Sequence, residues 1–228
     1  MPEVARADYL EELDNLEASA LGGLDLVNTA LTRTLEAVEH QDVELAQLVV
    51  ADDDRIDGRY LEVHQALITL LATQSPVATD LRLISSLLHV LKNIERMGDQ
   101  CVNICKVIPI SGNEPPADEE MVGLILSMGR HTKTLLMQAK RAFEERDVEM
   151  AQDLVRQDDV VDNLNRDCFR LALELGDDAD KREWAMTMLL AARAIERTAD
   201  NGVDIGEQVA FVVTGLFREF EDASHPQG

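Results

Sequence analysis

The chain contains an internal repeat, and this repeat limits the possible folds more than any other feature of its 228 residues. Residues 42–57 are identical to residues 147–162 at nine of sixteen aligned positions, and residues 91–104 are identical to residues 192–205 at six of fourteen. Segments that recur in the same order along a chain are expected to fold in the same way twice. The two halves of the chain should therefore form two similar structural units.

Each half shows the pattern of three long helices. Apolar residues recur at helical spacing, and the low content of 6 Pro, 12 Gly and 4% aromatic residues favours helix over sheet. We predict an all-α fold of tandem duplicated three-helix bundles, related by a pseudo-twofold axis. The six expected helices cover residues 8–40, 43–73, 79 or 80 to 107, 119–145, 147–175 and 180–217.

The boundary between the halves is expected at residues 109–118, a polar stretch that contains three prolines and one glycine. The first three-helix bundle then covers residues 1–108, and the second covers residues 119–220. Residues 221–228 are expected to form a flexible tail. The chain should thus consist of two bundles joined by a short linker.

The composition excludes some classes of partner. The formal net charge is −23, from 44 acidic and 21 basic residues, whereas binding to nucleic acid or to an anionic membrane needs basic surfaces. No apolar run reaches the roughly 18 residues that span a bilayer, and the acidic start of the chain is unlike a signal peptide. We expect a cytoplasmic protein without membrane insertion, whose acidic surface docks on basic protein surfaces. Three cysteines are expected to be reduced structural thiols: Cys101, Cys105 and Cys168.

Four pairs of acidic residues at spacing i, i+4 interrupt the apolar faces of these helices. At about 100° per residue, Glu95 falls on the same arc as Ile84 and Leu88. An unpaired carboxylate in an apolar site costs several kcal/mol, so a partner must compensate for it. We expect all four pairs to point inward or into a groove. They are Asp53 with Asp57, Glu95 with Asp99, Asp158 with Asp162, and Glu196 with Asp200.

Metal binding is the more specific of two explanations for these acid pairs. Two antiparallel helices that each present acids one turn apart can bring four carboxylates to one point, and oxygen ligands suit Mg²⁺, Mn²⁺ or iron. The alternative is compensation by solvent at a groove or by nearby basic side chains. The basic candidates are Lys92, Arg96, Arg193 and Arg197.

Two further residues lie near the pairs in the helical pattern. His64 corresponds to Phe169 in the second half, so we interpret it as a core or groove histidine and not as a required ligand. Asp204 stands where the first half has Asn103, one turn past Asp200, and could add a third oxygen ligand there.

Common catalytic motifs are absent from the sequence. It has no Gly-x-x-x-x-Gly-Lys-Ser/Thr loop, no Gly-x-Ser-x-Gly elbow and no His-Glu-x-x-His helix. Position 98 holds Gly and position 199 holds Ala, where a ferritin-like di-iron oxidase would have the histidine of a Glu-x-x-His motif. These absences argue against an enzyme.

Several segments together resemble the PhoU family of phosphate signalling proteins, and the resemblance extends over nearly the whole chain. It is carried by residues 74–82 (QSPVATDLR), 91–99 (LKNIERMGD), 102–104 (VNI) and 194–197 (AIER) with Asp200. The second half departs from the usual pattern of the family. Ala199 replaces the common glycine, Asn201 the common histidine and Asp204 the common asparagine.

The resemblance implies a negative regulator of the phosphate starvation response and of phosphate uptake. Such proteins link the ATPase subunit of the phosphate ABC transporter to the sensor histidine kinase of a two-component system. The resemblance also implies multinuclear metal clusters of iron, zinc, manganese or magnesium. The motif carries over to eight residues: Asp53, Asp57, Glu95, Asp99, Asp158, Asp162, Glu196 and Asp200.

We therefore expect a non-enzymatic cytoplasmic regulator that forms a homodimer and binds metal through its acid pairs. Two alternatives stay open. One is a carboxylate-bridged di-metal hydrolase or oxidase, and the other is a metal-free helical adaptor whose inward acids pair with Arg96 and Arg197.

Overall fold

The structure of the protein is a computed structural model that describes residues 3–111 and 116–220. These residues form seven α-helices and no strand, so the predicted all-α fold is confirmed. The helices are α1 (Glu3–His40), α2 (Val43–Asp52), α3 (Asp54–Thr73), α4 (Ala78–Ser111), α5 (Glu119–Glu145), α6 (Val148–Leu175) and α7 (Ala179–Thr214).

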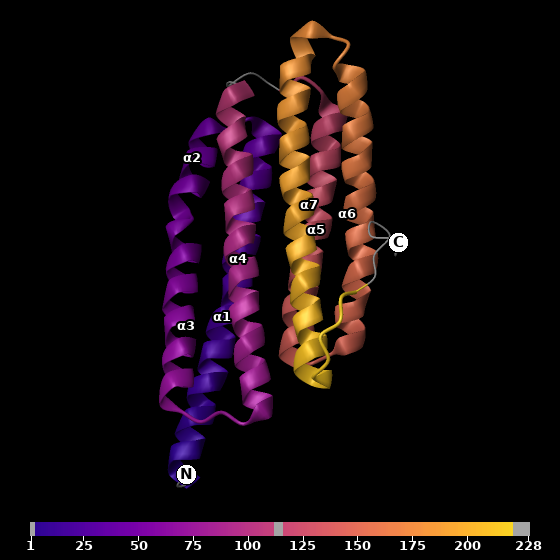
Figure 1. Cartoon of the computed structure of the whole chain (residues 1–228). Coiled ribbons are helices and arrows are strands. Elements are labelled where there is room, and N and C mark those ends of the chain that lie inside the picture. Colours follow the sequence, from indigo (N-terminus) through magenta and orange to yellow (C-terminus); the bar gives the residue numbers. More distant parts are fainter. Residues whose placement is uncertain (1–2, 112–115, 221–228) are drawn as a thin grey trace.

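The helices form two bundles that lie side by side (Figure 1). The first bundle contains α1, the α2–α3 pair and α4, and the second contains α5, α6 and α7. The third helices of the two halves, α4 and α7, pack along each other and run in opposite directions, and α1 packs against α5. This arrangement agrees with the predicted pseudo-twofold duplication. The buried apolar residues of both halves form one continuous core.

Aspartate caps fix where several helices begin. The side chains of Asp42 and Asp147, which are equivalent in the repeat, accept hydrogen bonds from the backbone N–H groups of Leu45 and Met150 at 2.9 Å. Asp118 caps α5 in the same way. A carboxylate at this position satisfies an N–H group that has no partner within the helix. The matching caps explain why the two halves begin their second helices at the same place in the repeat.

One predicted helix is divided in the structure. Residues 43–73 were expected to form a single helix, but the chain breaks at Asp53 into α2 and α3. Three consecutive aspartates, residues 52–54, occupy the break, and aspartate is a poor helix former. The equivalent segment of the second half contains two consecutive aspartates and stays within one helix, α6. The duplicated halves therefore differ at this point.

Other helix ends differ by a few residues from the expected ones. The first helix begins at Glu3 and not at Asp8. α4 continues through Pro109 to Ser111, so the first three residues of the expected linker are helical. α7 ends at Thr214 and not at Phe217, because Gly215 takes a left-handed conformation with φ of 72°. The expected tail, residues 221–228, lies outside the described residues.

Cys101, Cys105 and Cys168 are buried and form no disulfide, as expected. None of the described helices combines the length and apolar character needed to cross a bilayer.

Candidate functional site

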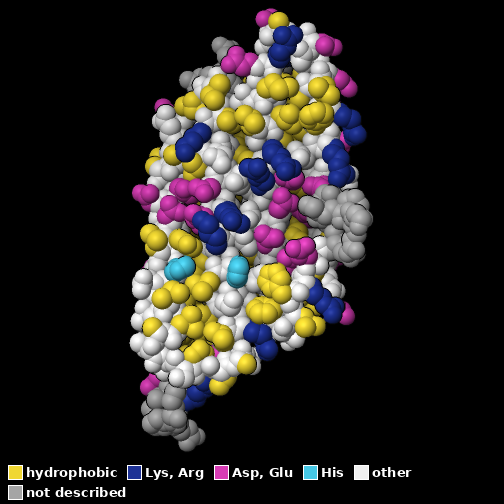
Figure 2. Space-filling view, viewed as in Figure 1, with side chains coloured by type: hydrophobic (Ala, Val, Ile, Leu, Met, Phe, Trp, Pro, Cys, Tyr) yellow, Lys and Arg dark blue, Asp and Glu magenta, His cyan; other side chains and the backbone are white. Residues whose placement is uncertain are grey.

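The eight acidic residues of the four pairs come from α2–α3 and α4 in the first half and from α6 and α7 in the second. In Figure 2 acidic side chains gather in two groups, one on each half, with Lys and Arg side chains between them. We call Asp53, Asp57, Glu95 and Asp99 the first acid cluster, and Asp158, Asp162, Glu196 and Asp200 the second acid cluster.

The first acid cluster is centred on Asp53. The pKa of the Asp53 carboxyl is raised to about 6, first by burial and then by the charges of Asp57, Asp99, Asp54 and Glu95, in that order. A carboxyl is affected in this way only by charges that lie close to it. The two acid pairs of the first half are therefore brought together, as the helical pattern predicted.

Asp99 lies in a related environment. Its pKa is raised by burial and by the charges of Glu95 and Asp57, while Lys92 and Lys106 lower it. Glu95 is paired with Lys92, whose Nζ lies 2.6 Å from Oε2 of Glu95. Basic side chains thus compensate part of the negative charge of the first acid cluster.

Gly98 makes room for the Asp53 carboxylate. A Cβ atom at position 98 would lie 2.8 Å from Oδ1 of Asp53 and 3.1 Å from Cδ1 of Ile56. A hollow of about 40 Å³ adjoins Asp53, Gly98 and Cys101, which is enough space for water or a small ion. The first half therefore has a space beside its central carboxylate that a larger residue would fill.

The second acid cluster is more deeply buried. Asp158 is 4% exposed and Glu196 is 6% exposed. The pKa of the Glu196 carboxyl is raised to about 7, mainly by burial and also by the charges of Asp200 and Asp162, although Arg193 and Arg197 lower it. The two acid pairs of the second half therefore also converge.

Glu196 has one oxygen with a partner and one without. The guanidinium of Arg193 donates a hydrogen bond to Oε1 of Glu196, whereas the buried Oε2 has no hydrogen-bond partner among the described residues. A buried carboxylate oxygen without a donor is costly. A cation at this oxygen would remove that cost, so the donor set of the second acid cluster fits a metal ion.

The expectation that all four pairs point inward is only partly right. Each pair has one more buried member and one more exposed member, and Asp57, Asp99 and Asp200 are exposed. Residues at i and i+4 differ by about 40° around a helix, so a pair at the edge of the apolar face is divided between core and solvent. The clusters therefore lie at the surface, with one buried side.

The carboxylates are not arranged as a completed metal centre. Within residues 3–111 and 116–220, no group of three or more His, Cys, Asp or Glu side chains stands ready to hold a metal ion. Metal binding would require side chains of the clusters to turn toward each other. Asp57 is exposed to solvent, so its side chain has room to change rotamer.

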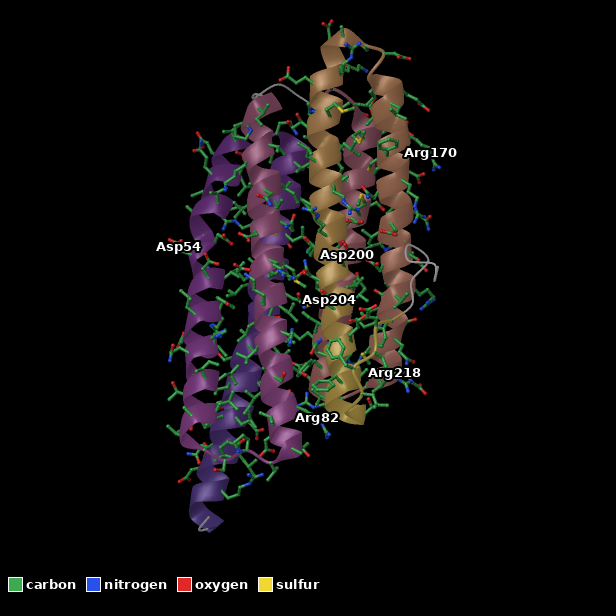
Figure 3. The ribbon with its side chains drawn as sticks, viewed as in Figure 1. Asp54, Arg82, Arg170, Asp200, Asp204 and Arg218 are labelled. Atoms are coloured by element: carbon green, nitrogen blue, oxygen red, sulfur yellow. The ribbon has the colours of Figure 1, made fainter. Side chains whose placement is uncertain are left out.

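Asp204 and His64 do not extend the clusters. The pKa of Asp204 is raised by burial and lowered by Arg96 and His89 of α4, so this carboxyl lies within reach of basic groups of the first half. Figure 3 labels Asp200 and Asp204 on α7. The half-buried His64 packs edge to face on Tyr60, with ring centroids 5.4 Å apart. This agrees with the interpretation of His64 as a groove histidine.

Comparison with known proteins gives a family match in both halves. The family model described as PhoU domain matches residues 24–108 and again residues 125–209. Each match contains two of the four acid pairs. The duplication seen in the sequence and in the fold is thus also a duplication of one family domain.

Related proteins and solved structures match over most of the chain. A Clostridium acetobutylicum protein named phosphate-specific transport system accessory protein PhoU homolog is 28% identical, over 96% of this chain and 100% of the relative. PhoU homolog 2 of Mycobacterium tuberculosis is 30% identical, over 93% of this chain and 99% of the relative. The crystal structure of the phosphate transport system regulatory protein PhoU from Streptococcus pneumoniae superimposes with a TM-score of 0.84 and 26% identity, covering 92% of this chain and 99% of that one.

Proposed function

Because the chain belongs to the PhoU family, we propose that it is a non-enzymatic regulator of phosphate uptake and of the phosphate starvation response. The proposal is supported by relatives that are named as accessory proteins of the phosphate-specific transport system. In this proposal the protein is a cytoplasmic homodimer that couples the ATPase subunit of the phosphate ABC transporter to a sensor histidine kinase. It acts by contact with these partners and not by catalysis.

We also propose that the two acid clusters hold metal ions. The observation that carries this proposal is the buried Oε2 of Glu196, which has no hydrogen-bond partner among the described residues although it lies within a group of converging carboxylates. The first acid cluster is the counterpart of this group in the other half of the chain. A bound divalent or trivalent cation would neutralise the carboxylates and hold neighbouring helices together. The first acid cluster would contribute Asp53, with the space beside Gly98, as its central ligand.

Metal content by mass spectrometry of the untagged protein tests this proposal. We expect several iron, zinc, manganese or magnesium ions per chain. Glu95→Ala/Asp99→Ala should remove the metal ions bound by the first acid cluster. Glu196→Ala/Asp200→Ala should remove those bound by the second acid cluster. Glu36→Ala/Glu39→Ala, which removes two exposed acids of α1, serves as the control and should keep the full content. A wild-type protein that is empty after purification with added metal would contradict the proposal.

The regulatory role needs a separate measurement in cells. Deletion of the gene should increase phosphate uptake in phosphate-rich medium, and the wild-type chain should restore the lower rate. Co-purification with the transporter ATPase and with the sensor kinase would test the partners directly. Unchanged uptake after deletion would contradict the role, whatever the metal content.

A metal-free helical adaptor is the second candidate, and a specific observation favours it. Lys92 pairs with Glu95 and Arg193 pairs with Glu196, so basic side chains already compensate part of each cluster. The two candidates differ in their response to a chelator. An unchanged melting temperature after treatment with a chelator would favour the adaptor.

A further inference from the structure

The second half carries an apolar groove between α6 and α7 that the sequence predictions did not include. Its volume is about 550 Å³. Two large apolar side chains that line it are exposed to solvent, Phe169 by 52% and Leu190 by 62%. Figure 2 shows hydrophobic side chains gathered over the upper parts of α6 and α7, with basic side chains at their margin. We call this feature the arginine groove; its walls include Arg166, Phe169, Arg170, Leu189, Leu190 and Arg193.

The repeat shows that the duplicated fold does not require this surface. In the alignment of the two halves, Phe169 corresponds to His64, and Leu190 corresponds to His89. The second half therefore has two large apolar side chains at solvent-exposed positions where the first half has histidines. Exposed large apolar groups in a groove cost solubility without contributing to the core, and they are typical of binding sites.

The charged side chains that line the groove are all basic, and each of them pairs with an acid of its own helix. Three arginines line it in a protein with a net charge of −23. Arg166 pairs with Asp162 at 3.3 Å, and Arg170 pairs with Asp167. These pairs are local and their guanidinium groups are largely exposed, so each contributes little and can be exchanged for another carboxylate. Figure 3 shows Arg170 on the outer side of α6.

We propose that the arginine groove binds an amphipathic helix of a partner protein, with an apolar face flanked by carboxylates. A groove between two antiparallel helices accepts the ridge of a third helix, whose apolar anchors at i, i+4 would pack on Phe169 and Leu190. The three arginines would pair with its carboxylates. The inference rests on the proposed regulatory function, because a regulator that acts by contact needs such a surface.

The same observations disfavour two other occupants. If a second copy docked symmetrically through the same groove, the arginines of the two chains would face each other, and like charges repel. An anionic membrane would lie against a concave surface on a face that also carries two groups of acidic side chains (Figure 2), and their negative charge would repel it. An acidic helix of another protein fits both the shape and the charge.

Peptide binding to the full-length protein tests the proposal. The probe is a fluorescein-labelled helical peptide of about 18 residues with leucines on one face and glutamates beside them; a second peptide has lysines in place of the glutamates. In fluorescence anisotropy we expect the glutamate peptide to bind at least about tenfold more tightly than the lysine peptide. Phe169→Ala/Leu190→Ala should weaken binding by about tenfold or more, and Arg170→Glu should weaken it as well.

The control variant is Leu61→Ala/Ile68→Ala, which removes apolar side chains of α3 that are 64% and 41% exposed; it should bind like the wild type. Equal binding of both peptides, or equal loss in the control, would overturn the proposal. The proposal would also be overturned if the wild type formed a dimer in sedimentation velocity and Phe169→Ala/Leu190→Ala abolished that dimer. Binding to phosphatidylglycerol vesicles that the same variant abolishes would overturn it too. If the protein has its full metal content and regulates phosphate uptake normally but does not bind the peptide, the groove is not a helix-binding site and the proposed function still stands.

Discussion

The Arg193 guanidinium donates a hydrogen bond to Glu196 and also lines the arginine groove. Arg193 therefore lies between the second acid cluster and the groove, and its charge can be used by either one. Arg166 has the same double position, because it pairs with Asp162 of the cluster and lines the groove. A change of charge in the second acid cluster should thus change the affinity of the groove.

Glu196→Gln is expected to increase the affinity of the metal-free protein for the glutamate peptide. The neutral amide holds Arg193 less strongly; even a fully exposed ion pair contributes ~0.2–1 kcal/mol, and Glu196 is buried, so the increase should be at least about 1.5-fold. Fluorescence anisotropy measures the change. Glu95→Gln, which alters the equivalent pair with Lys92 in the first half, should leave the affinity unchanged. An equal effect of both variants would show that only net charge matters.

The stability of the metal-free protein should depend on the protonation of Glu196. Its pKa is raised from 4.5 to about 7 in the folded chain, so the folded state binds the proton more tightly than the unfolded state. The stability that this proton provides is present below pH 4.5 and is lost as the pH rises through about 7. Glu196→Gln keeps the site neutral at every pH.

We therefore expect Glu196→Gln to be more stable than the wild type at pH 8, by roughly 1–2 kcal/mol after allowance for solvent screening. The two proteins should have similar stability at pH 4. Urea unfolding at both pH values in the presence of a chelator measures the difference. The exposed Glu174→Gln is the control and should show no such pH dependence. A wild-type protein that is the more stable of the two at pH 8 would contradict the prediction.

Gly98→Ala should reduce metal binding by the first acid cluster. The added Cβ would lie 2.8 Å from Oδ1 of Asp53, so the carboxylate would have to move away from its present position. We expect a folded protein whose metal content falls by the share of the first half, measured by mass spectrometry. Gly58→Ala on α3 is the control, since nothing lies within 4 Å of its added Cβ. Full metal content in Gly98→Ala would show that the space is not needed.

Gly129→Ala should destabilise the contact between the two halves. The added Cβ on α5 would overlap both terminal methyl carbons of Leu35 on α1, and overpacking of this kind costs ~1–3 kcal/mol. Thermal unfolding should show a lower melting temperature. Gly123→Ala lies in the same helix with nothing within 4 Å of its Cβ and should stabilise by up to about 1 kcal/mol. Similar melting temperatures for the two variants would mean that α1 and α5 separate easily.

The sequence predicts most of the local structure. Helical periodicity places the helices, and the recurrence of residues 42–57 in residues 147–162 reveals the duplication. The convergence of Asp53 with Asp99 also follows from the i, i+4 spacing on neighbouring helices. These features depend on interactions within one helix or between two helices of one bundle.

Features that depend on contact between the bundles were not predicted. Asp204 lies within reach of Arg96 and His89 because α7 packs against α4, and a helical pattern does not tell which third helix a residue faces. The exposure of Phe169 and Leu190 could not be predicted either, because apolar residues at helical spacing give the same pattern whether they are exposed or in the core. The break at Asp53 reflects a balance between helix propensity and packing that periodicity does not measure.

That break places the two equivalent acid pairs on different backbones. Asp158 and Asp162 stand on one unbroken helix of 28 residues, α6. Asp53 stands at the joint between the ten-residue α2 and α3, and its carbonyl oxygen accepts hydrogen bonds from the backbone N–H groups of Ile56 and Asp57. A change of angle at this joint would therefore act directly on the first acid cluster, whereas the helix that carries Asp158 and Asp162 has no such joint.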